Sequence, residues 1–318
     1  MKSTSRSVSS LGEFGLINHL TKQLPIDRSV ACGVGDDCAV IQKNRNTYQL
    51  LTTDMSIEGV HFDHKKVKPA EIGYKACARS ISDIAAMGGI PRYAVVAFAI
   101  PKTLPVRYVN DLFKGIKKCA SLFSVSIVGG DTSQSKNIMI AISVVGDVEK
   151  KRLVLRRGAR VGDGIYVTGT LGGSIIKKHV SFKPRVHEAR FLTHHASIHA
   201  MIDISDGLVQ DLGHILKSSG VGCVIEEPTV PVSRDALRIT RHDRHTALQH
   251  ALYDGEDFEL VFTAAPTTGV RLQKKWSRKF RIPLTRIGTI MSKRGIFIRS
   301  KKGTGKKNYK KDKGYTHF

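Results

Sequence analysis

Aspartate and glutamate recur in six short segments of this chain, most of which contain glycine and lie at the end of a predicted strand or the start of a predicted helix. In chain order the segments are residues 35–37, 52–54, 82–83, 129–132, 203–207 and 255–257. Side chains at such positions converge at the ends of a sheet, so the fold must gather carboxylates from distant parts of the chain. The chain has only 27 Asp and Glu against 51 Lys and Arg, a net charge of +24, which makes the placement of the acids informative.

A single aspartate in such a segment can act as a helix cap or a turn residue, so the functional prediction depends on the whole set. Asp83 is harder to explain as a cap, because it falls inside a predicted helix beside Ile81 and Ile84. A carboxylate that faces an apolar surface needs a cation or hydrogen bonds to offset its desolvation. We therefore expect a cluster of hard oxygen ligands for Mg²⁺, which keeps some waters and takes further ligands from substrate phosphates.

Several magnesium ions without a P-loop predict an unusual nucleotide site. The GTGKK sequence near the carboxyl end lacks the spacing of a P-loop. Metal ions would then carry the phosphate recognition that backbone amides supply in other nucleotide sites. Gly129 and Gly130 allow the backbone before Asp131 to approach a phosphate closely, and Arg156 can clamp phosphoryl oxygens.

Strands and helices are expected to follow one another without strict alternation. Strands are predicted at residues 39–41, 48–53, 93–100, 125–128, 138–145, 165–168, 200–204, 222–226 and 259–263, and helices at 12–24, 69–87, 106–123, 208–217 and 270–280. Pro69 suits the first turn of the second helix, and a glycine pair ends it. This order predicts an α/β protein built of layers rather than a doubly wound sheet. The basic run at 149–162 divides the chain into an amino-terminal domain, 1–148, and a carboxyl-terminal domain, 149–318.

Amino-acid composition restricts where in the cell the protein is expected and which partners it can bind. The apolar run at residues 93–100 is too short to cross a membrane, the first residues hold no apolar signal segment, and the five cysteines form no CxxC pair. We therefore expect a reducing cytoplasm. The charge favours anionic partners, but no basic strand with interleaved aromatic residues and no recognition helix supports a nucleic-acid-binding module. The lysine-rich stretch 301–313 is expected to be solvated.

Eight segments occur in an order that is specific as a set, although each is weak alone. They are GVGDDCAV, LLTTDMSIEGVHF, YKACARSISDIAAMGG, IVGGDTS, RRGARVGDGIYVTGTLG, FKPRV, AMIDISDGLVQDLGHI and LYDGEDFELVFT. Together they closely resemble the thiamine-monophosphate kinase family, in the aminoimidazole-ribonucleotide-synthetase-like superfamily, from about residue 12 to residue 318. The resemblance implies the two-domain fold of that superfamily, with a mixed sheet and packed helices in each domain, and a homodimer formed through the amino-terminal sheets. It also implies Mg²⁺-dependent transfer of phosphate from ATP to thiamine monophosphate.

The resemblance assigns site residues at the matching positions. The expected metal ligands are Asp37, Thr52, Thr53, Asp54, Asp83, Asp131, Asp203 and Asp206. The expected ATP contacts are Gly130, Asp131, Arg156 and Ser205. The expected contacts to thiamine monophosphate are His61, Glu256 and Tyr315, the last as an aromatic ring against the cationic thiazolium.

The expected chemistry needs no catalytic side chain. The attacking atom is a phosphate oxygen that is already ionised at neutral pH, so direct in-line transfer assisted by metal ions is sufficient. Selenophosphate synthetase and the purine-pathway synthetases share the acid-rich layout and are the alternatives. Selenophosphate synthesis would require a reactive cysteine in a glycine-rich amino-terminal loop, and the nearest candidate, Cys32, is better explained as packing at a strand end.

Overall fold

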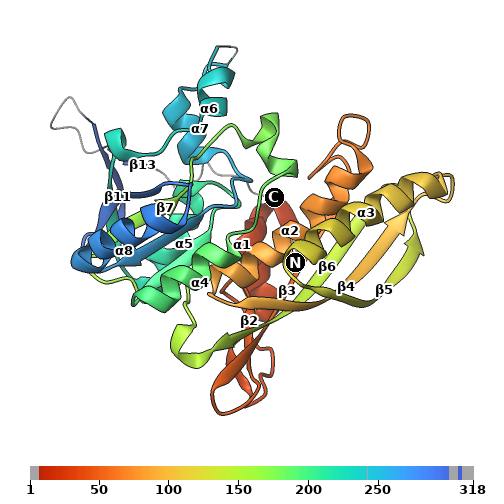
Figure 1. Cartoon of the computed structure of the whole chain (residues 1–318), viewed down its shortest axis with the longest axis horizontal. Coiled ribbons are helices and arrows are strands. Elements are labelled where there is room, and N and C mark those ends of the chain that lie inside the picture. The colour runs from red at the N-terminus through yellow and green to blue at the C-terminus, as the bar shows by residue number, and fades with distance from the viewer. Residues whose placement is uncertain (1–6, 242, 301–306, 310–318) are drawn as a thin grey trace, which may run out of the picture.

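The computed structural model describes residues 7–241 and 243–300, together with the backbone of residues 307–309. Two mixed sheets, one from each half of this part of the chain, are packed with helices (Figure 1). This arrangement confirms the predicted α/β class. No helix within the described ranges is long and apolar enough to cross a membrane.

The first sheet has six strands in the order β1-β2-β3-β6-β4-β5. The strands are β1 (Val30–Cys32), β2 (Ala39–Gln42), β3 (Thr47–Ile57), β4 (Ile90–Ile100), β5 (Ser126–Gln134) and β6 (Met139–Glu149). Neighbours are antiparallel except β4 and β5, which are parallel. The helix α1 (Val8–Thr21) precedes this sheet, and α2 (Pro69–Ala86) and α3 (Val106–Leu122) cover one of its faces.

The two covering helices approach each other closely because glycine lies at their contact. A Cβ atom at Gly73 of α2 would lie 1.9 Å from the carbonyl oxygen of Leu112, and one at Gly115 of α3 would lie 1.9 Å from that of Ala70. Only glycine fits at either position. The α2 helix ends before Gly88, whose φ of +73° is the left-handed conformation common after a helix C-terminus.

The other face of the first sheet is apolar and exposed. Residues that pair across neighbouring strands share a face, and the pairs Leu51–Val145, Val145–Tyr93 and Val95–Ser143 lie on this side. Leu51, Tyr93 and Val95 are between 41% and 50% exposed. Large exposed apolar side chains that share one sheet face are common where a protein binds a partner.

The second sheet has seven strands in the order β13-β12-β9-β11-β7-β10-β8. The strands are β7 (Gly164–Thr168), β8 (Ala200–Asp203), β9 (Gly222–Glu226), β10 (Leu260–Ala264), β11 (Leu284–Met291), β12 (Gly295–Arg299) and β13 (Lys307–Tyr309). The helices of this half are α4 (Val186–His195), α5 (Leu208–Ser219), α6 (Arg234–Ile239), α7 (Ala247–Tyr253) and α8 (Pro266–Lys279). Single turns of 3-10 helix occur at η1 (Lys150–Arg152), η2 (Ser174–Ile176), η3 (Lys178–Val180) and η4 (Glu227–Thr229).

The two halves share one hydrophobic core. Ile84 of α2 and Leu192 of α4 belong to the same buried cluster as Phe262 of β10 and Trp276 of α8. A second cluster fills the space between the other face of the second sheet and α5. The shared core holds α2 against the edge strand β8, and this contact positions the candidate site.

The observed elements extend beyond several predicted ones. The strand predicted to end at residue 53 continues to Ile57, and the strand predicted to end at residue 128 continues to Gln134. The helices α4, α6 and α7 and the strands β1, β11, β12 and β13 were not predicted. The predicted solvated stretch 301–313 lies outside the described residues, except that the backbone of residues 307–309 pairs with β12.

Candidate functional site

Three aspartates from distant parts of the chain meet where the two halves touch. Asp37 precedes β2, Asp83 lies in α2, and Asp203 ends β8. One carboxylate oxygen from each of the three residues lies within 4.8 Å of the other two. The prediction that distant acidic segments converge therefore holds for these three residues.

Neighbouring side chains orient each carboxylate of this aspartate cluster. The Ser82 hydroxyl donates to Asp203 Oδ2 at 2.6 Å, and the Thr52 hydroxyl donates to Asp83 Oδ2 at 2.5 Å. The guanidinium of Arg156 donates to Asp37 Oδ1 from Nη2 at 2.6 Å and from Nε at 3.1 Å. Arg156 and Thr52 thus contact carboxylates of the cluster rather than lying apart from it.

The electrostatics of the cluster favour a bound cation. Burial raises the pKa of the Asp203 carboxyl to about 7, and the charge of Asp37 adds to this effect. Burial, reinforced by the charges of Asp54 and Asp203, raises the pKa of Asp83 well above its usual range. The Oδ2 atoms of Asp37 and Asp54 are buried without a hydrogen-bond partner. Packed carboxylates with unpartnered oxygens fit a hard divalent ion such as Mg²⁺, which prefers oxygen ligands.

Asp54 lies at the margin of the cluster and is paired with a cation of α2. Its Oδ1 atom is 3.3 Å from Nη2 of Arg79. Asp54 lies within β3, three residues before its end, rather than at the strand end that the sequence predicted. Its side chain shares the face of Ile142, which is buried under the helices, and this register directs it toward Asp83.

The loop before α5 carries Ser205 and Asp206 and depends on Asp211, a residue that the sequence analysis missed. The Oδ2 atom of the buried Asp211 accepts the backbone N–H groups of Ser205 and Asp206, both at 3.0 Å. Gln210 Nε2 lies 3.4 Å from Asp206 Oδ2. An acidic residue in the first turn of a helix is the sequence signal that could have identified Asp211.

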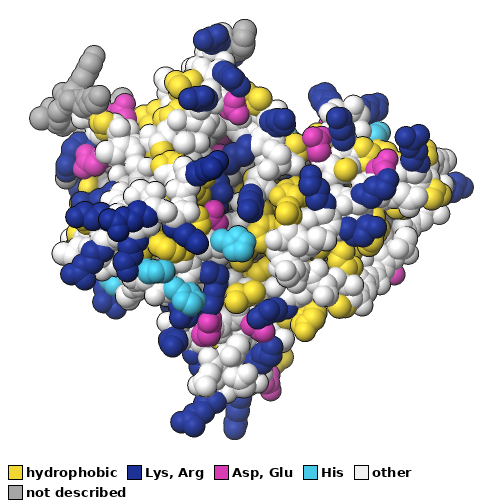
Figure 2. Space-filling view, in the orientation of Figure 1, with side chains coloured by type: hydrophobic (Ala, Val, Ile, Leu, Met, Phe, Trp, Pro, Cys, Tyr) yellow, Lys and Arg dark blue, Asp and Glu magenta, His cyan; other side chains and the backbone are white. Residues whose placement is uncertain are grey.

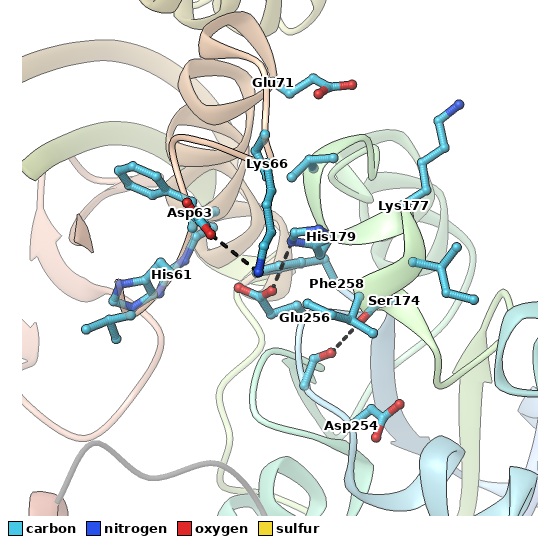
Figure 3. Close-up of a pocket in the computed structure, with 18 of the residues that line it drawn as sticks. His61, Asp63, Lys66, Glu71, Ser174, Lys177, His179, Asp254, Glu256 and Phe258 are labelled. Carbon is cyan, nitrogen blue, oxygen red and sulfur yellow. Dashed lines mark hydrogen bonds and ion pairs between the residues drawn. The ribbon is translucent and has the colours of Figure 1, made fainter. Parts of the chain in front are cut away.

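Ser205 and Asp206, which follow Asp203 of the aspartate cluster, line a cavity of about 1360 Å³, part of which Figure 3 shows. Residues 58–67 also line it, together with residues 174–177, 179–180, 254–256 and 258. His61 and Glu256 therefore both line this cavity, as Asp206 does. His61 accepts the backbone N–H of Ile57 at Nδ1, at 3.1 Å.

Glu256 is held in the cavity by a strained loop. Its φ is +65°, and that of Phe258 is +48°, values that residues other than glycine rarely adopt. The backbone N–H of Glu256 donates to the carbonyl oxygen of Ser205 at 2.6 Å, and the Phe258 ring stacks on Phe182 with centroids 3.8 Å apart. Strain of this kind persists where surrounding contacts over-determine the backbone, and it is common at binding sites.

The structure does not bring every predicted residue into this region. Across neighbouring strands, Asp54 pairs with Ile142, Ile142 with Val96, and Val96 with Gly130, so these residues share one face of the sheet. Asp131 follows Gly130 in the strand and therefore faces the opposite side. Three strand spacings also separate Asp54 from Asp131, about 14 Å at about 4.8 Å each. The exposed Asp131 lies in the interior of β5, not at its end as predicted.

Thr53 also points away from the aspartate cluster. It faces the exposed side of the first sheet, where its hydroxyl accepts a hydrogen bond from Ser143 at 3.0 Å. Tyr315 lies outside the described residues. Two residues beside Glu256, Lys75 and His179, were not predicted, because a lone lysine in a helix or histidine in a loop carries no motif.

Comparison with known proteins identifies the family. Residues 35–148 match the family described as AIR synthase related protein, N-terminal domain. The chain is 37% identical to the thiamine-monophosphate kinase of Rhodopirellula baltica over 287 residues, 88% of each chain, and 32% identical to that of Aquifex aeolicus over 97% of this chain and 98% of the relative. It also matches the solved structure described as AaThiL complexed with AMPPCP and TMP, with a TM-score of 0.84 and 32% identity over 99% of this chain and 100% of the other.

More distant structures share the fold. The hydrogenase maturation protein HypE of E. coli matches 82% of this chain and 85% of its own with a TM-score of 0.68 at 20% identity, which supports the predicted superfamily fold. The relatives above share more than 30% identity with this chain over most of its length. The chain therefore belongs to the thiamine-monophosphate kinase family.

Proposed function

We propose that this protein transfers the γ-phosphoryl group of ATP to the phosphate of thiamine monophosphate, giving ADP and thiamine diphosphate. The observation that carries the proposal is the cluster of Asp37, Asp83 and Asp203, which is followed along the chain by Ser205 and Asp206 in the wall of a cavity that His61 and Glu256 also line. A related structure at 32% identity was solved with AMPPCP and TMP, which supports the same pair of substrates here.

Mg²⁺ is the ion that best fits the cluster, and Asp37, Asp83 and Asp203 would hold it, with Asp54 beside them. When bound, it would neutralise charge on the phosphates during transfer. Arg156 keeps Asp37 oriented, and Thr52 and Ser82 orient the other two carboxylates. The acceptor phosphate is already anionic, so the role of these side chains is to position charge and no side chain removes a proton.

The nucleotide would lie against the loop before α5. Ser205 and Asp206 form this loop, and Asp211 fixes their backbone. Arg156, from the segment that links the two halves, donates from its backbone N–H to Asp36 Oδ2 at 3.1 Å and from its guanidinium to Asp37 of the aspartate cluster. We assign Ser205, Asp206 and Arg156 to ATP binding. We assign His61 and Glu256, which line the cavity, to thiamine monophosphate, together with Tyr315 on the resemblance alone.

We also propose a homodimer formed through the exposed face of the first sheet. Asp131 and Thr53 lie on this face, away from the aspartate cluster of their own chain. A second copy packed there would cover Leu51, Tyr93 and Val95 and would bury Asp131 in an interface. This arrangement lets the exposed residues Thr53 and Asp131 take part in a site completed by the partner.

The domain boundaries and the compartment of the protein are further proposals. We assign residues 1–148 and 149–318 to two domains, and we propose a reducing cytoplasm because all five cysteines, each in the described part of the chain, are free thiols. Nucleic acid is not proposed as a partner. Lys and Arg side chains are spread over the whole face in Figure 2 rather than gathered in one stripe, which does not favour such a surface.

The decisive experiment is ATP turnover by the purified protein with thiamine monophosphate, with and without Mg²⁺. We expect thiamine diphosphate and ADP in equal amounts, and no product after chelation of the metal. Hydrolysis of ATP without thiamine diphosphate, or no reaction at saturating Mg²⁺, would contradict the proposal.

A second experiment tests the route of transfer. Because the acceptor is anionic, phosphate should pass to it directly. Rapid mixing of the protein with ATP labelled at the γ-phosphate, followed by acid and alkaline quenching, should yield labelled thiamine diphosphate and no labelled protein. A phosphohistidine or phosphoaspartate that forms and then decays at the rate of turnover would show a covalent route instead.

A further inference from the structure

Lys75 is a buried cation behind the wall of the cavity. It lies on α2, and only 1% of its surface is exposed. Lysine is almost never buried to this extent without partners, because removal of an ammonium group from water is costly. The surroundings of Lys75 must therefore supply acceptors for its charge.

Three groups surround the ammonium group, each from a different segment. Nζ of Lys75 lies 2.7 Å from the carbonyl oxygen of His61, 2.6 Å from Oε1 of Glu256 and 3.3 Å from Nδ1 of His179. The carbonyl and the carboxylate oxygen accept two of the three ammonium hydrogens, and His179 lies beside both Lys75 and Glu256. Lys75 thus connects the segment of residues 58–67 in the first half of the chain to two segments in the second half.

Glu256 is the partner through which Lys75 can affect a ligand. Glu256 and His179 line the cavity, and Figure 3 shows their side chains directed toward each other. Nδ1 of His179 is 3.4 Å from Oε2 of Glu256, and the Glu256 side chain is 28% exposed. Burial raises the pKa of the Glu256 carboxyl, but His179 and Lys75 together outweigh this effect, and the resulting pKa is about 2. The cavity therefore presents an ionised carboxylate at neutral pH.

We propose that Lys75 is a positioning residue for the recognition of thiamine monophosphate and that it acts through Glu256. This inference rests on the proposed function. The ammonium group contacts Oε1 of Glu256 from behind the cavity wall while His179 contacts Oε2, so the two residues together hold the carboxylate in one orientation at the cavity wall. A carboxylate in a fixed direction suits a ligand that carries a cationic ring and an exocyclic amine. Lys75 does not touch the ligand itself.

The test uses four variants of the full chain: Lys75→Met, Glu256→Gln, the double variant, and Lys114→Met as a control. Methionine keeps the apolar stem of lysine and removes its charge. Lys114 lies on the neighbouring helix α3, where it pairs with Asp111 at the surface. The steady-state kcat and the KM for each substrate are measured for all four variants and the wild type, together with thermal unfolding.

For Lys75→Met we expect the KM for thiamine monophosphate to rise by about tenfold, while the KM for ATP stays within about twofold. Glu256→Gln should show the same selectivity, and the double variant should be no more than about twofold worse than Glu256→Gln, because the two residues act as a unit. Lys114→Met should behave as the wild type. Equal effects of Lys75→Met on both KM values would overturn the inference. So would a double variant whose KM for thiamine monophosphate rises by the product of the two single fold-changes.

Two further outcomes are distinguishable. If Lys75→Met does not fold, the comparison of Glu256→Gln with the double variant decides, since the double variant buries no unpaired carboxylate. Equal KM values for thiamine monophosphate in that pair support the inference, and a further tenfold rise overturns it. A wild type that does not phosphorylate thiamine monophosphate would refute the proposed function, whereas an active wild type with an unselective Lys75→Met would refute only the role of Lys75.

Discussion

The three clustered aspartates differ in how their charge is compensated. Asp37 accepts two hydrogen bonds from the Arg156 guanidinium. Asp83 accepts one hydrogen bond from the Thr52 hydroxyl, and Asp203 accepts one from the Ser82 hydroxyl. A hydroxyl offsets much less of the cost of burying a carboxylate than a guanidinium does. The two aspartates without a cationic partner therefore have the strongest requirement for a bound metal ion.

Asp54→Asn should keep the fold and lower kcat by about a hundredfold or more, because the amide keeps the shape of the side chain but removes a charge from the cluster. The measurement is turnover at saturating ATP, thiamine monophosphate and Mg²⁺. The surface variant Asp111→Asn, on α3, is the control and should keep wild-type activity. Retention of most activity by Asp54→Asn would show that Asp54 does not contribute to the metal site.

Asp211→Ala should raise the KM for ATP by about tenfold and leave the KM for thiamine monophosphate nearly unchanged. The change removes the acceptor of two backbone N–H groups, those of Ser205 and Asp206, and an unsatisfied buried N–H costs about 1–3 kcal/mol. Asp211→Asn keeps an acceptor oxygen and should show a much smaller effect. Equal KM values for ATP in the alanine variant and the wild type would contradict this role for Asp211.

At the scale of elements, local signals predicted α2 well and β5 poorly. Pro69 and Gly88 bound α2 in the sequence as they do in the structure. The prediction ended β5 at the glycine pair before Asp131, but a Cβ atom at Gly130 would lie 1.9 Å from the carbonyl oxygen of Val96. Gly130 therefore serves a close approach of strands, and sequence alone does not distinguish this use from a turn.

The missed strand β11 has a different cause. Its buried residues Leu284, Ile287 and Ile290 are three apart rather than two, because the pairing with β7 shifts register between Arg286 and Gly288. The bulge removes the alternation by which a strand is recognised. The same limit applies to the site, because the acidic segments were visible in the sequence, whereas the partners Lys75 and Asp211 are defined only by tertiary contacts.

Gly115→Ala should lower the free energy of unfolding by about 1–3 kcal/mol, because the added methyl group overlaps the carbonyl oxygen of Ala70 and forces α2 and α3 apart. Denaturant titration measures the change. Gly15→Ala is the matched control, since a Cβ there meets only the Leu11 side chain at 3.5 Å, and alanine in a helix is favoured by up to about 1 kcal/mol. A Gly115→Ala protein as stable as the wild type would show that the two helices can separate without cost.

At the scale of the whole molecule, burial of acids couples metal binding to pH. Asp203 has a raised pKa of about 7 in the folded chain, against an ordinary value of 3.8, so the folded state holds a proton that the unfolded state releases between these values. The resulting stabilisation is complete below pH 3.8 and is lost as the pH rises through about 7. The proposed Mg²⁺ would bind the deprotonated carboxylates, so it would replace this contribution at high pH.

Addition of Mg²⁺ should therefore raise the unfolding temperature more at pH 8 than at pH 5.5, and the metal-free protein should become less stable between these values. Thermal unfolding with Mg²⁺ or with a chelator measures both effects. Asp203→Asn removes the titrating group and should reduce the dependence on pH. A Mg²⁺ effect of equal size at both pH values would indicate binding away from the buried carboxylates.

Tyr93→Lys should convert the proposed dimer into a monomer of 35.0 kDa, because it places a charge in an apolar face that a second copy would cover. Analytical ultracentrifugation of the wild type should give about twice that mass. Val106→Lys, at a position that is 74% exposed at the start of α3, should remain dimeric. A wild type that is monomeric at all concentrations would exclude this interface.

The hydrogen bond between Ser82 and Asp203 has a consequence for how genes of this family can recombine. This 2.6 Å bond joins α2 to β8, and its two residues are 121 positions apart in the chain. A crossover between these positions would place α2 from one parent against β8 from another, and a misfit of about 1 Å is enough to break such a bond. Viable exchanges should therefore inherit α2 and β8 together, while α1, which has no buried residue, can be exchanged independently.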